Sequence, residues 1–555
     1  MKKYVLLFSI SIFILKSPGI YAQAHPRYFV LFKDKANTPF SVSKPLEFLS
    51  ERAVLRRTKQ NISVTVNDLP VNPSYIAAVN QTGGKVIYSS RWFNGVVVEA
   101  SDTQLESIKK LSFYKSTELN NPVSSANALG VGRIKASANK FGTTEDLDYG
   151  AMRNQLVMLG ADVLHKKGFH GEGMLIGVFD AGFNRSNELG YLKHLYDEKR
   201  VIETYDFIAR NNDVYDDHWH GNAVLSTMAA YQPGSLVGVS YKAAYVLYRT
   251  ENNATETPYE EVTWLIAAER ADSLGVDVIN TSLGYFEFEN EFNTPAYNHT
   301  YQDMDGKTTI ISRAAKFACR AGILVVNAAG NEGNNQWRYI TAPADVDSVL
   351  TVGACNYDKS YAPLSSIGPN AVGLIKPDVA AVGAGTVVGN NLGTGSASTA
   401  SGTSFASPQI AGLAAILWQA HPSLNAGQII DVLKKSGNQA PKPDFFLGYG
   451  VPGIVAAEEV IQKDYTLLGT EPDLLGSMII APNPVSGNII LKVPVTLTGR
   501  RATFRVRDQA GTMVSVSEGI LTEETTISTP ATGSGLYLLE VGIGKAIRVV
   551  RFVKK

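Results

Sequence analysis

The long middle part of the chain alternates between short apolar runs and amphipathic helical patterns. The apolar runs include MLIGVFD, AAYVLYRT, DVINTSLG, ILVVNAAGN and SVLTVGAC. Between them, YEEVTWLIAAERADSLG and TTIISRAAKFACRAG repeat apolar residues three and four positions apart, which is the period of a helix. Units of strand, helix and strand predict a parallel sheet with helices on both faces. The expected fold class is therefore α/β, with functional groups beyond the carboxyl ends of the strands.

Two smaller modules flank this central part, which we expect to span 150–465. Extended and helical patterns alternate from RYFVLF to DTQLESIKKL and predict a small α+β domain over 25–118. Residues 119–149 are polar and rich in Asn, Ser, Ala and Gly, which predicts a linker. After this central part the period changes to two, as in RATFRVRD and GLYLLEVGIGKAIRVVRFVKK. A small β-sandwich is expected over 466–555.

The first 24 residues have the layout of a secretory signal peptide. MKKYVLLFSISIFILKSPGIYAQA begins with two lysines, continues with an apolar stretch and ends at Ala22-Gln23-Ala24. An uncleaved membrane anchor is the alternative, and Lys16 inside the apolar stretch disfavours it. We expect the protein to be secreted or held at the cell surface, with no membrane span in the mature form.

The charge balance, composition and cysteine count limit the classes of partner and of fold that we expect. The 555 residues carry 51 basic and 51 acidic side chains, so no global field favours nucleic acid. With 45% hydrophobic and 18% charged residues, the chain has an ordinary globular mix, and we expect a monomer. Two cysteines, Cys319 and Cys355, cannot make a disulfide scaffold; buried thiols are favoured, and a single disulfide stays open.

The segment SGTSFASPQIAGLAAIL places Ser404 at the expected start of a helix. A helix start offers free amide hydrogens and a partial positive charge, which favour an oxyanion near the hydroxyl. Pro408 is expected near the first turn, where a missing amide costs least. An ordinary serine or threonine cap is the alternative for this segment alone.

A serine nucleophile needs a base and a group that orients the base. Asp180 closes the apolar run MLIGVFD, where a carboxylate emerges at the working edge of the sheet. His220 precedes Gly221 and a helix of small residues in HWHGNAVLSTMAA. Taken singly, an Asp at a strand end is also typical of a turn, and a His before Gly is also typical of a loop.

Four segments in the order VFDAGF, HGNAVLSTMAA, NAAGNEG and SGTSFASP resemble the motifs of the subtilases, the subtilisin-like serine endopeptidases. The resemblance covers about residues 150–462 and includes the family's order of Asp, His and Ser. It implies that Asp180, His220 and Ser404 form a catalytic triad, and that Asn331 donates from its side chain to an oxyanion. In that scheme His220 takes the Ser404 proton while Asp180 fixes the imidazole tautomer.

The same resemblance implies residues that bind a polypeptide substrate. NTSLG looks like the family's substrate-binding strand, so the backbone of an extended peptide is expected to pair with Ser282, Leu283 and Gly284. A primary specificity pocket with room for a large side chain is expected to be lined by Ala328, Ala329 and Gly330. Core strands are the alternative for both stretches.

The chemistry implied by the resemblance requires no cofactor. Asp303 and Asp305 in DMDG are potential oxygen ligands for calcium, although two carboxylates in a turn are more often solvated. The stretch YQPGSLV lacks the Asn-rich loop that holds calcium in some subtilisins. Structural calcium is therefore unsupported, and metal ligands stay unknown. Asn222 and Ala223 replace the Thr and His that usually follow the His-Gly pair, and neither change removes a triad group.

The flanking modules resemble domains found around secreted subtilases. The N-terminal module is similar to a propeptide, which implies help in folding and inhibition of the enzyme until cleavage between 119 and 148; a permanent binding domain is the alternative. The C-terminal module resembles the sorting domain of type IX secretion in Bacteroidetes, through APNPVSGNIILKV, Gly511 and the basic ending. The secretion machinery is then a partner, and carbohydrate binding is the rival role.

Together these patterns predict a secreted serine endopeptidase that is made as a zymogen and hydrolyses peptide bonds through an acyl-enzyme. The alternative is a surface adhesin or binding protein on a catalytically inactive protease scaffold. An esterase of the α/β-hydrolase class is disfavoured because Ser404 does not stand in a G-x-S-x-G turn.

Overall fold

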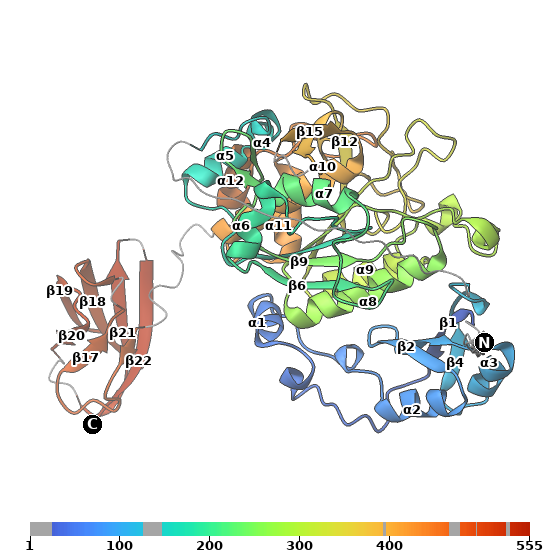
Figure 1. Ribbon diagram of the computed structural model, residues 1–555. Helices are drawn as coiled ribbons and strands as arrows, with labels where there is room; N and C mark the ends of the chain where they lie inside the picture. Colours follow the sequence, from blue (N-terminus) through green and yellow to red (C-terminus); the bar gives the residue numbers. More distant parts are fainter. Residues whose placement is uncertain are drawn as a thin grey trace, which may run out of the picture. The chain divides into compact units, whose positions relative to one another are not determined.

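The computed structural model describes residues 25–125, 147–391, 396–465, 478–494, 497–528, 533–544 and 546–555. The chain divides into two compact units, Met1–Glu458 and Glu459–Lys555. The first unit contains a small N-terminal domain and a large α/β domain (Figure 1). The expected signal peptide and most of the expected linker lie outside the described residues. None of the helices in the described ranges has the length and apolar character needed to cross a membrane.

The large domain is built on a parallel sheet of seven strands, which confirms the predicted α/β class. Its order is β13-β12-β11-β10-β5-β9-β6, and every neighbouring pair is parallel. The chain builds outward from β10 through β11, β12 and β13 on one side, whereas β9 and then the edge strand β6 lie beyond β5 on the other, so the direction of winding changes between β5 and β10. The strands are β5 (Leu175–Asp180), β6 (Val201–Asp206), β9 (Ala244–Arg249), β10 (Val278–Thr281), β11 (Leu324–Ala328), β12 (Leu350–Cys355) and β13 (Val379–Val382).

Helices cover both faces of this sheet (Figure 1). On one face α10 (Thr403–Ala420) crosses the strands from β10 to β13 and packs against α7 (His220–Ala229). On the other face lie α8 (Pro258–Leu274) and α9 (Ile310–Arg320). The remaining elements of the domain are α4 (Arg153–Leu159), α5 (Ala161–Lys166), α6 (Lys193–Asp197), α11 (Ala426–Lys435), α12 (Ile454–Val460), and the short strands β7 (Tyr231–Gln232), β8 (Leu236–Val237), β14 (Thr386–Gly389) and β15 (Ala397–Ala400).

Helix α8 has clear start and stop signals in its sequence. Thr257 and Glu260 form a capping box, Pro258 occupies the first helical position, and Gly275 ends the helix with φ +89°. Its charged Glu269 and Asp272 are buried. The reason is that α8 is covered on its outer side by the N-terminal domain.

The N-terminal domain places its sheet between two layers of helices. The four-stranded antiparallel sheet has the order β2-β3-β1-β4. On β1, Tyr28, Val30 and Phe32 face the domain's own core, whereas Phe29 and Leu31 join the core formed with α8 and α9. The elements are β1 (Arg27–Phe32), α1 (Glu51–Lys59), α2 (Pro73–Gln81), β2 (Lys85–Ser90), β3 (Gly95–Glu99), α3 (Asp102–Lys109) and β4 (Tyr114–Thr117).

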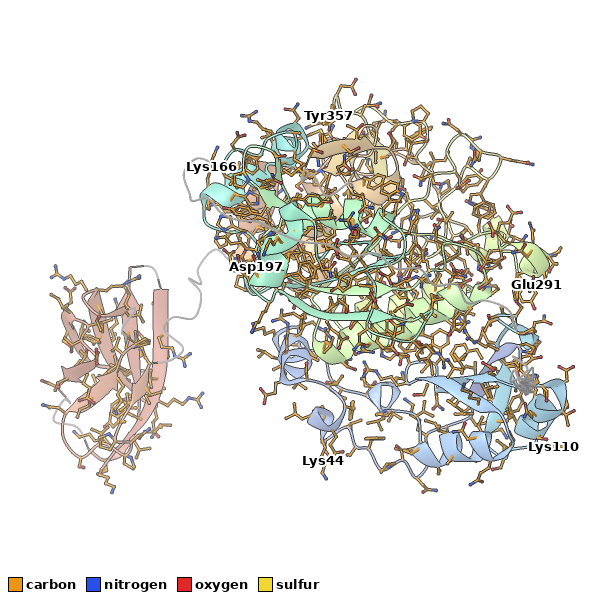
Figure 2. All side chains as sticks on the ribbon, viewed as in Figure 1. Lys44, Lys110, Lys166, Asp197, Glu291 and Tyr357 are labelled. Carbon is orange, nitrogen blue, oxygen red and sulfur yellow. The ribbon has the colours of Figure 1, made fainter. Side chains whose placement is uncertain are left out.

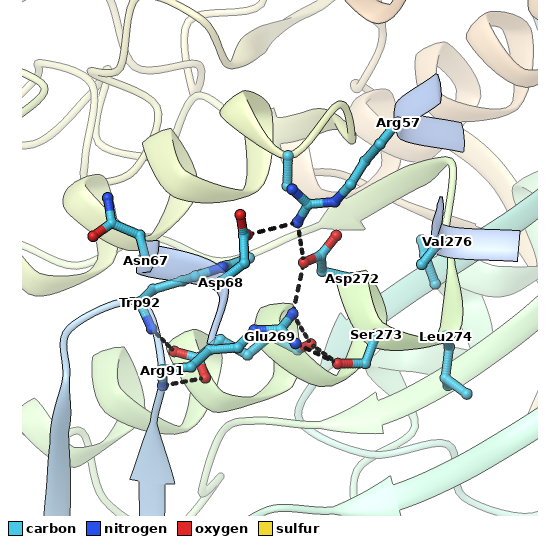
Figure 3. Close-up of polar contacts among 12 residues, drawn as sticks. Arg57, Asn67, Asp68, Arg91, Trp92, Glu269, Asp272, Ser273, Leu274 and Val276 are labelled. Atoms are coloured by element: carbon cyan, nitrogen blue, oxygen red, sulfur yellow. Dashed lines mark hydrogen bonds and ion pairs between the residues drawn. The ribbon is translucent and has the colours of Figure 1, made fainter. Parts of the chain in front are cut away.

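Three arginines of the N-terminal domain meet one carboxylate of the large domain. Arg57 and Arg91 contact Asp272 Oδ2 at 2.7 and 2.6 Å (Figure 3). Arg56 contacts the other oxygen of this carboxylate. Burial alone would raise the pKa of Asp272, but the three arginine charges lower it. Glu269 accepts hydrogen bonds from the Ser90 hydroxyl and from the backbone amides of residues 91 and 92. These buried charges join the two domains.

The second unit consists of two small antiparallel sheets that share one hydrophobic core. One sheet has the order β16-β17-β20 and the other β19-β18-β21-β22. Buried and exposed residues alternate along β18, so the predicted period of two is confirmed. The strands are β16 (Ile479–Ile480), β17 (Ile489–Lys492), β18 (Arg501–Asp508), β19 (Met513–Ile520), β20 (Glu524–Ile527), β21 (Gly535–Ile543) and β22 (Ala546–Lys554).

Candidate active site

Asp180 and His220 are joined by a hydrogen bond at the carboxyl edge of the sheet. Asp180 is the last residue of β5 and its side chain is 1% exposed. The imidazole Nδ1 of His220, the first residue of α7, lies 2.9 and 3.1 Å from the two carboxylate oxygens. Asp180 Oδ1 also accepts the Ala181 amide at 2.8 Å, which fixes the carboxylate. The pair therefore lies near the reversal of strand order, where ligands bind in such sheets.

Two glycines allow the loops that carry this pair to touch. A Cβ atom on Gly221 would lie 2.2 Å from the carbonyl oxygen of Gly182. Gly182 itself has φ +146°, and a Cβ there would lie 2.6 Å from the Asp217 Cβ atom. Any larger residue at these positions would separate His220 from Asp180.

The Asp180 carboxylate changes the protonation of His220. Burial alone would lower the pKa of the imidazole, but the Asp180 charge and hydrogen bond outweigh it and raise the pKa above its ordinary value. Since Nδ1 donates to the carboxylate, the neutral ring presents Nε2 as an acceptor. This arrangement suits a general base.

Ser404 is the second residue of α10 and exchanges two hydrogen bonds with Ser282. The Ser404 hydroxyl donates to the Ser282 carbonyl at 3.2 Å, and the Ser282 hydroxyl donates to the Ser404 carbonyl at 2.9 Å. Pro408 explains why the Ser404 carbonyl is available, because proline has no amide to donate back four residues. Pro408 is the sixth residue of the helix, so it lies past the first turn in which the sequence placed it.

The structure places the residue after Ser404 against His220, and no hydrogen bond joins Ser404 to His220 in the described residues. The ring of Phe405, which follows Ser404, lies 5.3 Å from the His220 ring between centroids. The Ser404 hydroxyl instead donates its hydrogen bond to the carbonyl oxygen of Ser282. Catalytic hydrogen bonds are often long or broken before substrate binds.

Asn331 reaches the same helix start from the loop after β11. Its Oδ1 accepts the backbone amide of Thr403 at 2.8 Å. The Thr403 hydroxyl shares its one proton between Asn331 Oδ1 and the Gly330 carbonyl oxygen, each at 3.1 Å. Within the described part of the chain, the Nδ2 group of Asn331 donates no hydrogen bond. Its two N–H protons are therefore available to an acceptor beside Ser404. The sequence did not single out Thr403. Its only signal was its place between Gly402 and Ser404.

The predicted substrate-binding stretches continue two neighbouring strands. Ser282 to Gly284 follow β10, and Gly330 and Asn331 follow β11, which is paired in parallel with β10. A Cβ on Gly284 would lie 2.0 Å from the Thr341 hydroxyl, and one on Gly330 would lie 2.6 Å from the Ser366 hydroxyl. Leu283, Ala328 and Ala329 are buried. Both stretches end at the edge where Asp180 and Ser404 lie.

The two candidate calcium ligands serve the backbone instead. Asp303 accepts the Thr300 amide and hydroxyl, both at 2.7 Å. Asp305 accepts the amides of Lys307 and Thr308 at 2.9 Å. Across the described ranges, no group of three or more His, Cys, Asp and Glu residues is arranged to hold a metal ion.

Both cysteines are free thiols. Burial raises the pKa of Cys319 to about 11 and that of Cys355 to about 12. Neither side chain is therefore an activated nucleophile, which leaves Ser404 as the candidate.

Residues 171–450 match the model of the subtilase family, and residues 27–135 match the peptidase S8 propeptide domain of Bacteroidota. The chain belongs to the subtilase family. It is similar to subtilisin DY of Bacillus licheniformis, with 26% identity over 304 residues, 54% of this chain and 97% of that protein. It is also similar to the serine protease AprX of Bacillus subtilis, with 28% identity over 318 residues, 52% of this chain and 66% of that protein.

A solved structure extends the likeness in fold. The epidermin leader peptide processing serine protease of Staphylococcus aureus covers 80% of this chain and 99% of its own, with a TM-score of 0.52 and 17% identity. This subtilase is therefore a serine-type endopeptidase with a subtilisin-like fold, and its N-terminal domain is a propeptide domain.

Proposed function

We propose that this subtilase hydrolyses peptide bonds with Asp180, His220 and Ser404 through an acyl-enzyme. The hydrogen bond between Asp180 and His220 beside the start of α10 is the observation that carries the proposal. An intact carboxylate and imidazole pair next to a helix-start serine has the chemistry of a nucleophile, base and orienting group. It disfavours an inactive adhesin, which has no need of such a pair.

Substrate binding frees the nucleophile. The Ser404 hydroxyl donates to the Ser282 carbonyl, which is the acceptor that an extended peptide would use when it pairs with residues 282–284. When a substrate amide takes that carbonyl, the Ser404 hydroxyl turns to Nε2 of His220. The small residues Ala328, Ala329 and Gly330 leave space for the side chain before the scissile bond.

The chemical steps follow from the positions of the side chains. His220 Nε2 takes the Ser404 proton while Oγ attacks the carbonyl carbon, and the Asp180 carboxylate stabilises the imidazolium. The Ser404 backbone amide and Asn331 Nδ2 donate to the oxyanion. His220 then protonates the leaving amine, and a water molecule repeats the sequence to release the acid.

Labelling by a fluorophosphonate tests this proposal. The purified wild-type protein is expected to take up one label on the peptide that contains Ser404, and Ser404→Ala is expected to take up none and to cleave no casein. Ser401→Ala is the matched control, because Ser401 is an exposed neighbour just before the helix. Casein cleavage by Ser404→Ala at the wild-type rate would refute the assignment.

We also propose that residues 1–24 direct export, that the chain is cut between 119 and 148, and that the mature form is a monomer. In this scheme the domains are the propeptide domain 25–118, the linker 119–149 and the catalytic domain 150–465.

The β-rich unit 466–555 acts as the type IX sorting domain, supported by its separate core and its basic last strand. A chain lacking 478–555 is expected to keep its activity in vitro and to stay inside the cell that makes it. Normal export of that chain would rule out the sorting role.

A further inference from the structure

A cavity lined by carboxylates lies beside the Asp180 and His220 pair. Its volume is about 170 Å³, and its wall begins at Ala181, the residue after Asp180. The loop between β9 and α8 and the first turn of α8 supply most of the wall. This loop is tied to β5 because the Thr250 amide donates to the Asp180 carbonyl at 3.0 Å. The acidic side chains of the wall are Glu251, Glu256, Glu260 and Glu289.

Among the described residues, these four carboxylates form no ion pair with a basic side chain. The main charges that act on Glu251, Glu256 and Glu260 are those of other carboxylates. Glu260 is 2% exposed and accepts one hydrogen bond, from the Thr257 amide at 3.1 Å. A buried carboxylate without a counter-charge is costly unless a ligand supplies one. The wall is therefore suited to a positively charged group.

The pKa values of the carboxylates in the cavity wall are consistent with this need for a positive charge. Burial and then the charge of Glu289 raise the pKa of Glu256 to about 7. Burial and then the Glu256 charge raise the pKa values of Glu251 and Glu260 well above the ordinary range. A bound cation would remove the repulsion that causes part of these shifts.

The shape of the site favours a side chain over a metal ion. Among the described residues no group of three or more His, Cys, Asp and Glu side chains is arranged to hold a metal ion. A volume of about 170 Å³ equals several waters at about 30 Å³ each, which is room for the end of a long side chain. A guanidinium carries five N–H donors in a fork and an ammonium carries three, so either can serve several carboxylates at once.

The cavity also lies within reach of a bound peptide. Tyr285 follows the stretch 282–284 that the proposed function gives to the substrate backbone, and its hydroxyl donates to Glu251 at 3.0 Å. The opposite side of the cavity is Ala181, next to Asp180. A side chain on the acyl side of the scissile bond can therefore enter between these two walls.

We propose that this cavity is a specificity pocket for a lysine or arginine side chain of the peptide substrate, on the acyl side of the scissile bond. The proposal rests on the proposed function, which supplies the path of the peptide.

The chain's own processing segment has matching charge. Residues 126–144 contain Arg133, Lys135 and Lys140 and no acidic residue. The segment starts after Ser125, whose side chain hydrogen-bonds Glu291 (labelled in Figure 2), two residues from Glu289 in the cavity wall. Ser125, the last described residue before this basic segment, therefore lies near the acidic cavity wall.

Paired peptides test the proposal with the purified mature enzyme. The quenched fluorescent peptides differ at one acyl-side position at a time, which carries Arg, Lys, norleucine or Glu. One position is expected to favour Arg and Lys over norleucine by about 10- to 100-fold in kcat/KM, the range for hydrogen bonds to charged groups. Glu256→Gln and Glu289→Gln are expected to reduce this preference, whereas Glu287→Gln, an exposed residue of the same segment outside the cavity, leaves it unchanged.

The outcomes separate this proposal from the proposed function. Cleavage of the norleucine peptides tests hydrolysis alone, so equal rates for basic and neutral peptides would overturn only the pocket. Competitive inhibition of the mature enzyme by non-cleavable Arg and norleucine peptides gives the same comparison without turnover of those peptides. Equal inhibition constants would also overturn the pocket. If calcium raises the melting temperature of the wild type but not of Glu256→Gln, and no basic preference exists, the cavity is a metal site and the proposal is wrong.

Discussion

The carboxamide oxygen of Asn331 accepts both the backbone amide and the hydroxyl of Thr403, the residue before Ser404. These two bonds set the direction of the Asn331 Nδ2 group relative to the nucleophile. Thr403→Ala removes one of them and is expected to lower kcat about 2- to 10-fold with little change in KM, the range for one neutral hydrogen bond.

A double-variant comparison checks this role of Thr403. Asn331→Ala is expected to lower kcat about 100- to 1,000-fold, as the loss of such a donor does in subtilisin. Adding Thr403→Ala to Asn331→Ala is expected to lower kcat little further, because the Asn331 side chain that Thr403 orients is already absent. Fully additive losses would show that Thr403 acts on something else.

The activity is expected to fall at acid pH with a midpoint above the ordinary imidazole pKa of about 6.5. His220 must be neutral to accept a proton, and Asp180 raises its pKa, so the active form is lost as pH drops through that raised value. Asp180→Asn is expected to move the midpoint to lower pH and to lower kcat about ten-thousandfold. The profile of kcat/KM against pH measures both effects, and an unmoved midpoint would contradict the pairing.

The preference for basic side chains is expected to increase with pH through about 7. Glu256 has a pKa of about 7, and only its charged form attracts a cation. Glu251 and Glu260 line the same cavity and also have raised pKa values, so they add negative charge as the pH increases. Glu289 is the fourth carboxylate of the wall. The ratio of kcat/KM for Arg and norleucine peptides is the right measurement, because the titration of His220 cancels in it. A ratio that does not change between pH 6 and 8 would contradict the assignment of Glu256.

The zymogen is expected to lose stability when Asp272 is removed. In the Ser404→Ala background, which we expect to keep the propeptide attached because we propose that the enzyme cleaves itself, Asp272→Ala leaves Arg56 and Arg91 buried without their counter-charge. Such a loss costs about 3–5 kcal/mol, and thermal unfolding measures it. Asp197→Ala is the control, since its exposed pair with Lys193 (Asp197 is labelled in Figure 2) is worth about 0–1 kcal/mol. Equal melting temperatures for the two variants would show that the buried ion cluster does not stabilise the zymogen.

The sheet and the positions of the candidate residues could be predicted from sequence, because both depend on local patterns. Apolar runs separated by helical periods define parallel strands, and Asp180 ends one of these runs. The role of Thr403 could not be predicted, because it depends on a loop 72 residues away folding back to the helix start. The acidic run TENNATETPYEE can be read from the sequence. Its burial could not be predicted from the sequence, because the packing of α8 against the sheet determines which of these side chains are buried.

The burial of charged residues at the boundary between the propeptide domain and the catalytic domain could not be predicted from the sequence for a similar reason. Asp272 belongs to a helix with an ordinary mixture of apolar and polar residues, and its side chain, 0% exposed, is paired with arginines of a second domain. A helical pattern describes the sequence of one element and carries no information about the surface that docks on it.

Departure of the N-terminal domain would leave Glu269, Asp272 and Asp277 without the arginines that contact them. The electrostatic potential of that side of the catalytic domain would then change from nearly balanced to negative. The two forms of the enzyme would elute at different salt concentrations from an anion exchanger, so maturation could be followed by chromatography without any substrate.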